Sequence, residues 1–338
     1  MKNGFYLGYD ARGMGEAEIR RQAALLIEEG FYRAGYRTLR LGQVWQENGE
    51  PSTRFNDPLA LAEALRALGF LLDVTVDSRA KPDQANEWIE KLGAQMVTVI
   101  SAENRAAAER VVSSLVHCKR LALCVGQKDI RWAAEFADVV ELDVISGDAD
   151  FFEITRNQLD SCRNGDVDIS LSDVNLRAEA LHAGGVYGVG NVPSRFDAYR
   201  NQAIFTQICM LGCPLVLTGN VSAYSRSFAE LVTNANLIRL ARLGSGKTVR
   251  YYDPWHILLG KPNGGNMKFM LILNRCHGDA PTDILPADLG WESYFSVREW
   301  PEDTLAGECL ERFAVHVETS DHPETPCCRL YMIEKSDF

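Results

Sequence analysis

The sequence predicts a parallel α/β domain followed by a smaller antiparallel β domain, and three observations support this fold class. Apolar runs typical of buried strands alternate with amphipathic segments typical of helices over most of the chain. From residue 249 onward the pattern changes to short strands separated by turns. The length of 338 residues suits a barrel of roughly 250 residues with a small second domain. We therefore predict an α/β fold in which a (β/α)8 TIM barrel over residues 1–246 precedes a C-terminal antiparallel β-sandwich over residues 247–338.

The predicted barrel strands share β-branched and aliphatic side chains, as buried parallel strands do. They cover residues 5–10, 38–41, 70–77, 96–100, 121–125, 139–144 and 214–218. The seventh strand is expected within residues 178–189, where closely spaced glycines obscure the pattern. Helices are expected at residues 16–30, 57–69, 82–92, 104–116, 130–136, 151–162, 195–211 and 227–240. Asp57 and Pro58 illustrate the signals, because an acidic N-cap followed by proline in the first turn begins a helix.

The C-terminal domain is predicted from five short strand segments and one hairpin signal. The segments cover residues 249–252, 267–273, 294–299, 313–317 and 329–333. The residues Asn263-Gly264-Gly265-Asn266 separate the first two segments and are typical of a hairpin turn. Short antiparallel strands joined by such turns indicate a β-sandwich.

Charge and composition restrict the class of function. The net charge is −11, and both nucleic acids and anionic membranes require a basic face, so we predict neither as a partner. No apolar run is long enough to span a bilayer. The nine cysteines are scattered without a C-x-x-C pair, and no basic segment followed by an apolar one marks a secretory leader. These features predict a cytoplasmic protein with reduced thiols, and they leave open the redox state of Cys327 and Cys328.

One stretch around the second predicted strand carries a family resemblance. Ala34-Gly35-Tyr36, followed after four residues by Leu41-Gly42-Gln43-Val44-Trp45, resembles the signature A-G-Y-x-x-x-x-L-D-D-x-W of the α-galactosidase (melibiase) family of glycoside hydrolases. The two acidic residues of the signature, which grip sugar hydroxyls in that family, fall on Gly42 and Gln43. The resemblance therefore implies the fold and the place of the site, although neither residue carries the carboxylate that the family uses there.

Other segments resemble the same family in the same order along the chain. Residues 69–77 resemble the third strand of the family and keep Asp77, and Gly188-Val189-Gly190-Asn191 resembles its V-G-N motif. Further matches lie at residues 213–217, 231–234 and 270–275. The order of these matches over nearly the whole chain implies the barrel of the family followed by its C-terminal sandwich.

The resemblance also implies where the catalytic residues of the family would lie. Members cleave α-galactosides with retention, using one Asp at the end of strand four and a second Asp after strand seven. Laid in register, the first position falls on Ile100, or on Ser101 after a slip of one residue, and the second falls on Gly185. Because Ile100 and Gly185 carry no carboxylate, we expect that the family's hydrolysis is lost.

Carboxylates near predicted strand ends are the remaining candidates for chemistry, because the substrate of a barrel enzyme faces those ends. Asp10 and Asp77, from the first and third strands, form a candidate pair of relocated catalytic acids. The substrate-binding candidates are polar or aromatic residues expected at the same edge: Tyr9, Gln43, Trp45, Ser101, Glu103, Asp129, Asp143 and Asn220. Each has a structural alternative, since acids also cap helices or face solvent, and aromatic side chains also pack in cores.

Three hypotheses about function follow, and the sequence leaves them open. The first is a carbohydrate-binding homologue without hydrolysis, and the second is an active glycosidase that uses Asp10 and Asp77. The third is a non-catalytic scaffold or subunit whose barrel mouth is closed by bulky side chains. We predict no cofactor and no metal, because no group of His, Cys or carboxylate side chains shows ligand spacing. The expected partner is a carbohydrate or glycoside, and a homo-oligomer is left open.

Overall fold

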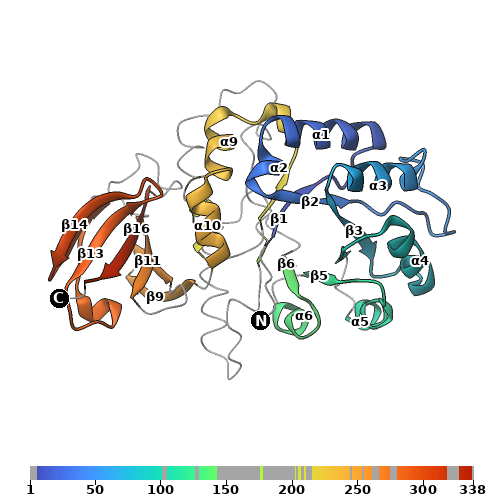
Figure 1. Ribbon diagram of the computed structural model, residues 1–338. Helices are drawn as coiled ribbons and strands as arrows, with labels where there is room; N and C mark the ends of the chain where they lie inside the picture. Colours follow the sequence, from blue (N-terminus) through green and yellow to red (C-terminus); the bar gives the residue numbers. More distant parts are fainter. Residues whose placement is uncertain are drawn as a thin grey trace. The chain divides into compact units, whose positions relative to one another are not determined.

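The chain forms two compact units. The computed structural model describes residues 6–100, 105–125, 129–142, 176–177, 202, 205–206, 209–210, 215–243, 246–252, 255–260, 266–274, 280–317 and 327–336. The N-terminal unit comprises Met1–Asp150, Asp173–Ala183 and Pro214–Tyr224. The C-terminal unit comprises Phe151–Ser172, Gly184–Cys213 and Ser225–Phe338. Figure 1 labels most of the elements of both units and colours the chain from blue at the N-terminus to red at the C-terminus.

An eight-stranded parallel sheet forms the centre of the N-terminal unit. Its strands lie in the order β7-β6-β5-β4-β3-β2-β1-β8, and every neighbouring pair is parallel. The bounds are β1 Leu7–Asp10, β2 Tyr36–Leu41, β3 Leu71–Asp77, β4 Met96–Ile100, β5 Arg120–Val125, β6 Val139–Leu142, β7 Leu176–Arg177 and β8 Leu215–Thr218. The predicted parallel α/β architecture is confirmed.

Two features show that this sheet curls. β8, the last strand in the chain, pairs with β1, so the series of strands returns to its start. Tyr6 and Val216 also share a buried cluster with Met96, Ala122 and Val139. The last three residues lie on β4, β5 and β6, which a flat sheet would hold far from β1 and β8. A pair between β7 and β8 is not recorded within the described residues, so the closed ring of eight strands stays a prediction.

Strand β7 begins before the range in which the sequence predicts the seventh strand. β7 consists of Leu176–Arg177 and pairs with β6, whereas the predicted range of residues 178–189 lies outside the described part of the chain. The predicted helices at residues 151–162 and 195–211 fall wholly or largely outside it as well.

Helices follow the strands of the N-terminal unit and lie outside them in Figure 1. They are α1 Glu16–Glu28, α2 Phe31–Ala34, α3 Pro58–Ala67, α4 Pro82–Leu92, α5 Arg105–Ser114 and α6 Ile130–Phe136. The Asp57 side chain accepts hydrogen bonds from the backbone N–H groups of Leu59 (3.1 Å) and Ala60 (2.9 Å), which confirms the predicted N-cap of α3. Of the helices that the structure describes, none is long and apolar enough to cross a membrane.

The C-terminal unit is built from antiparallel sheets. One sheet has six strands in the order β14-β13-β16-β11-β10-β9, and a second pairs β12 with β15. The bounds are β9 Gly246–Tyr252, β10 Trp255–Gly260, β11 Met267–Asn274, β12 Ala280–Ile284, β13 Phe295–Trp300, β14 Thr304–Leu310, β15 Phe313–Val317 and β16 Cys327–Lys335. β10 pairs with β11 on either side of the predicted hairpin turn, whose residues 263–265 lie outside the described part. The sequence prediction omits β10, β12 and β14.

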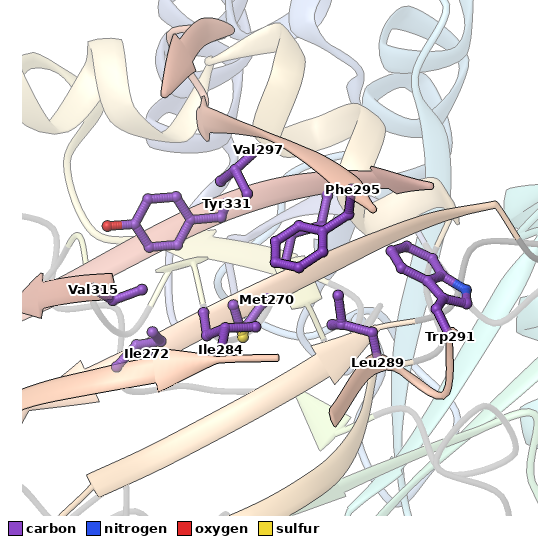
Figure 2. Close-up of a cluster of buried hydrophobic side chains, with 10 residues drawn as sticks. Met270, Ile272, Ile284, Leu289, Trp291, Phe295, Val297, Val315 and Tyr331 are labelled. Atoms are coloured by element: carbon purple, nitrogen blue, oxygen red, sulfur yellow. The ribbon is translucent and has the colours of Figure 1, made fainter. Parts of the chain in front are cut away.

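An apolar core joins the two antiparallel sheets. Phe295, Tyr331 and Ile272 come from the six-stranded sheet, and Ile284 and Val315 come from β12 and β15. Figure 2 shows these side chains gathered between the strands. Burial of aromatic and branched side chains between two sheets is the packing that the predicted β-sandwich requires.

Two helices replace one predicted helix in the C-terminal unit. The sequence predicts a single helix over residues 227–240, but the structure has α9 Arg226–Val232 and α10 Ala235–Leu243. The break occurs because the Asn234 side chain accepts hydrogen bonds from the backbone N–H groups of Asn236 (3.0 Å) and Leu237 (3.1 Å) and so caps α10. Both helices belong to the C-terminal compact unit, and the domain boundary at residue 246 stays a prediction.

Candidate functional site

The candidate site lies at the edge of the parallel sheet where β1 to β4 end. Asp10, Asp77 and Ile100 are the last residues of β1, β3 and β4, and Gly42 directly follows β2. Parallel strands bring their carboxyl ends to one edge, and barrel enzymes bind their substrates there. We call these four residues and the loops that follow them the mouth.

Asp10 is a buried carboxylate held by the loop that follows it. Its Oδ1 accepts a hydrogen bond from the Arg12 backbone N–H at 2.9 Å, and its Oδ2 accepts one from Arg12 Nε at 2.8 Å. The Asp10 side chain is 6% exposed, whereas that of Arg12 is 29% exposed. This ion pair fixes the path of the chain as it leaves β1.

Asp77 makes a similar pair with the arginine two residues later. Its Oδ1 accepts from Arg79 Nε and its Oδ2 accepts from Arg79 Nη2, each at 2.9 Å. The Asp77 backbone N–H donates to Gln43 Oε1 at 3.3 Å, and Gln43 Nε2 donates to the Trp45 carbonyl at 3.1 Å. Gln43 therefore connects the loop after β2 to the end of β3, which is a structural role at the mouth.

The register keeps Asp10 and Asp77 apart. Asp10, Arg40 and Asp73 are level across β1, β2 and β3. Asp77 lies four residues beyond Asp73, which is about 13 Å along the strand, and two strand spacings add about 10 Å across the sheet. The two Cα atoms are thus on the order of 16 Å apart, whereas the two carboxyl groups of a glycosidase pair are roughly 5–9.5 Å apart. The structure does not bring the predicted pair together.

Ile100 lies beside Asp77 at the mouth. The two residues are level in the register of β3 and β4. Thr98 Oγ1 contacts both oxygens of Asp73 at 3.0 Å, so these two side chains are on one face of the sheet. Because side chains two and four residues apart on a strand share a face, Ile100 and Asp77 are on that face too. The end of β4 therefore presents a half-buried apolar side chain with no group for acid–base or nucleophilic chemistry.

A buried polar network lies beneath the mouth. Arg40 Nε donates to Asp73 Oδ2, and Arg40 Nη2 donates to the Tyr6 hydroxyl at 3.2 Å. Both charged side chains are 1% exposed, and Thr98 supplies a further hydrogen bond to the carboxylate. Such a pair is tolerated in the interior only when its donors and acceptors are satisfied. Charged residues inside the apolar strands β2 and β3 are the signal from which the network could have been predicted.

The two predicted aromatic contacts are packed in the interior. Tyr9 is fully buried, and its hydroxyl donates to the Gly219 carbonyl. Burial, with the nearby carboxylates of Glu18 and Asp10, raises the pKa of Tyr9 above its ordinary range. Trp45 is 3% exposed and stacks on Trp88 with ring centroids 6.1 Å apart. Both rings pack against other parts of the chain, which is the structural alternative to stacking on a sugar.

Two further candidates, Asp129 and Asn220, form hydrogen bonds that connect neighbouring elements. The Asp129 carboxylate accepts from Arg105 Nε (2.9 Å) and Nη2 (2.6 Å), which joins the segments after β5 and β4. Asn220 Oδ1 accepts from Gln22 Nε2 at 3.0 Å and from the Ser222 backbone N–H at 3.2 Å. Asn220 thus connects the end of β8 to α1.

Three predicted site residues, Ser101, Glu103 and Asp143, lie outside the described residues. Gly185 lies outside them as well.

A cavity among the described residues lies in the C-terminal unit. It has a volume of about 500 Å³ and is lined by α9, α10 and strands β13 and β16, with Trp300, Tyr331 and Glu299 among its walls. The lining residues all belong to the C-terminal unit, so this cavity is separate from the mouth. Among the residues described, no group of three or more His, Cys, Asp or Glu side chains could hold a metal ion.

Comparison with known proteins identifies the fold. No protein-family model matches the sequence, and no curated protein matches it either. Among solved structures, a family 27 β-L-arabinopyranosidase from Geobacillus stearothermophilus superposes with a TM-score of 0.80 at 13% identity, covering 98% of this chain and 97% of that chain. α-Galactosidase I from Mortierella vinacea gives 0.76 at 14% identity, with 99% and 98% covered. An α-galactosidase from Saccharomyces cerevisiae gives 0.75 at 12% identity, also with 99% and 98% covered. The α-galactosidase resemblance is confirmed at the level of the fold.

Proposed function

We propose that this chain binds a carbohydrate at the mouth of an α-galactosidase-like barrel and lacks the retaining hydrolysis of that family. The observation that carries the proposal is Ile100 at the end of β4, the position where the sequence resemblance places the catalytic nucleophile. The likeness to glycosidases over nearly the whole length of each chain supports a glycoside ligand. It also supports a closed ring of eight strands in the N-terminal domain, followed by the C-terminal sandwich.

The loss of hydrolysis follows from the chemistry that retention requires. A retaining mechanism needs a carboxylate nucleophile and a second carboxyl group about 5–5.5 Å away. Ile100 offers neither, and Gly185, which falls on the acid/base position, has no side chain. The Asp10 and Asp77 carboxylates are far apart in the register, and each forms an ion pair with its own arginine. These features favour binding without cleavage over a glycosidase with relocated acids.

The mouth keeps groups suited to hydrogen bonding of a sugar. Asp77 is 23% exposed and Arg79 is 81% exposed, so both reach solvent at the end of β3. Sugar hydroxyls both donate and accept, so a carboxylate next to a guanidinium is a suitable polar contact. The cytoplasmic location and the oligomeric state stay predictions.

The proposal is tested by measuring binding and cleavage on one panel of aryl glycosides and a glycan array. We expect saturable binding to at least one sugar without release of the aryl group. Asp77→Asn should weaken that binding about tenfold, whereas Glu87→Gln, which removes an exposed carboxylate from α4, should leave it unchanged. Release of the aryl group by the wild type, abolished in Asp10→Asn or Asp77→Asn, would establish the active glycosidase instead. The absence of binding to any sugar would favour the scaffold.

A further inference from the structure

Arginines surround the mouth on a chain that is acidic overall. Arg12 and Arg79 each lie two residues after a strand, Arg54 lies in the loop after β2, and Arg105 begins the helix after β4. The net charge of the chain is −11. Three of these guanidinium groups pair with carboxylates, namely Arg12 with Asp10, Arg79 with Asp77 and Arg105 with Asp129. Arg54 differs from them.

The Arg54 guanidinium lies at the mouth without a carboxylate. Its Nη2 contacts the Gln43 carbonyl at 3.5 Å, and its Cζ lies 5.9 Å from the centroid of the Phe55 ring. For the part of the chain that the structure describes, no ion pair of Arg54 is recorded, and the residue is exposed. An exposed guanidinium that contacts one carbonyl and pairs with no carboxylate keeps N–H donors that can bind an anion.

The guanidinium lies close to the end of β2, where Gly42 has no side chain. A Cβ atom on Gly42 would lie 3.1 Å from Arg54 Nη2, 3.7 Å from Arg12 Cα and 3.7 Å from the Gly13 nitrogen. The Arg54 carbonyl also accepts a hydrogen bond from the Glu16 backbone N–H at 3.4 Å, which holds the segment against the loop after β1. The absence of a side chain at residue 42 leaves the guanidinium directly over the strand end.

We propose that the mouth selects an acidic sugar, whose carboxylate or sulfate binds the Arg54 guanidinium over Gly42. This inference rests on the proposed function and adds the class of substrate. The planar fork of an arginine binds a carboxylate or sulfate through two parallel hydrogen bonds, which a neutral hydroxyl cannot match. The Arg–Asp pairs around it are neutral overall, so they do not by themselves repel a negative group at this edge.

Residue 42 offers a direct way to occupy the proposed subsite from within the chain. Gly42 is not among the glycines with positive φ, so its backbone accepts an L side chain. In Gly42→Asp the introduced Cβ would lie 3.1 Å from Arg54 Nη2, and we expect the carboxylate attached to it to pair with this flexible arginine. In Gly42→Ala the same Cβ is added without charge. Comparison of the two variants therefore distinguishes two effects. One is competition between the introduced carboxylate and an acidic ligand for Arg54, and the other is the loss of space caused by an added Cβ.

The experiment measures dissociation constants by calorimetry for methyl α-galactoside, methyl α-galacturonide, galactose 6-sulfate and inorganic sulfate. For the wild type we expect the acidic sugars to bind at least tenfold more tightly than the neutral one, and less tightly at high salt. Arg54→Gln and Gly42→Asp should each remove that preference, and Gly42→Ala should change it less than threefold. Arg37→Gln is the matched control, since Arg37 is exposed at the opposite end of β2. Thermal melts verify that each variant is folded.

The outcomes distinguish the two proposals. Equal binding of neutral and acidic sugars, or a preference that survives Arg54→Gln in a folded chain, overturns the inference and leaves the proposed function intact. Binding of inorganic sulfate but of no sugar overturns the inference by identifying a simple anion as the ligand. If no probe binds, both proposals fail. A preference lost in Arg54→Gln and Gly42→Asp, and kept in Gly42→Ala and Arg37→Gln, supports the inference.

Discussion

The interior of the parallel sheet contains a buried polar network beside its apolar residues, whereas the core cluster of the C-terminal unit is apolar. Beneath the mouth, Arg40, Asp73 and Thr98 are almost completely buried and depend on one another for hydrogen bonds. In the C-terminal unit, aromatic and aliphatic side chains such as Phe295 and Ile272 fill the space between two sheets. A core of the second kind is stabilised by the area it buries, whereas one of the first kind is stable only while every partner is present. The difference predicts that the two interiors respond differently to substitution.

The largest expected effect is on the apolar core. Phe295→Ala removes a fully buried ring and should cost about 3–5 kcal/mol, because the lost transfer energy adds to that of the cavity. Hydrogen exchange measured by mass spectrometry should show reduced protection in β11, β13 and β16 and unchanged protection in β2 to β4. Leu305→Ala on β14, at a residue that is 52% exposed, serves as the control and should cost below about 1 kcal/mol. Equal costs for the two variants would contradict the role given to this core.

Substitutions in the polar interior should have free-energy effects that are coupled rather than additive. Arg40→Met leaves the Asp73 carboxylate buried without its cation and should cost about 3 kcal/mol. Adding Asp73→Leu to that variant removes the orphaned charge, so the double variant should recover more than half of the loss. Denaturant unfolding of the two single variants and the double variant gives the coupling energy. Additive costs would show that the network is not a unit.

Removal of a helix cap should lower the free energy of unfolding by a similar amount in both units. Asp57 caps α3 in the N-terminal unit, and Asn234 caps α10 in the C-terminal unit, each through two backbone N–H groups. Asp57→Ala and Asn234→Ala should each cost about 1 kcal/mol. Hydrogen exchange should place each loss in the helix concerned. A loss above about 3 kcal/mol from either variant would mean that the side chain does more than cap.

The smallest expected effect concerns thiol reactivity in the N-terminal unit. Burial raises the pKa of Cys118 to about 11, with its thiol donating to the Arg120 carbonyl at 2.6 Å. Because the folded pKa lies above the unfolded one, the associated stability is present below about pH 9 and is lost as the pH rises toward 11. At pH 9, alkylation of Cys118 should be about 50-fold slower than that of an unfolded cysteine. Mass spectrometry of individual peptides measures the rate, and alkylation at the unfolded rate would contradict this burial.

Much of the fold could be predicted from the sequence because its signals are local. Strands such as β4 and β15 and helices such as α6 match their predicted bounds, since apolar runs and periodicity are properties of neighbouring residues. The single turn α2 and the break at Asn234 were missed, because each depends on one residue, Gly30 with φ +83° or Asn234 as a cap. The prediction omits β14 because Gly307 and Glu308 are not typical of strands.

The sequence could predict where the site residues lie on their strands, but not which side chains contact one another. Asp10 and Asp77 do end their strands as predicted. Their separation depends on the register of three strands, and the pair of Arg40 with Asp73 joins residues 33 apart in the chain. The stacking of Trp45 on Trp88 likewise requires the loop after β2 to fold back over α4. Sequence patterns report the direction of a side chain along its own element, but not the partner that another element brings.

The most direct test of the central claim is a search for a covalent glycosyl intermediate. A 2-fluoro glycosyl fluoride of a sugar that binds would trap that intermediate on the nucleophile of a retaining enzyme. Intact-mass spectrometry after incubation should show no adduct on this chain, although the sugar occupies the mouth, because β4 ends in Ile100. A stoichiometric adduct mapped to a carboxylate at the mouth, such as Asp77, would contradict the account.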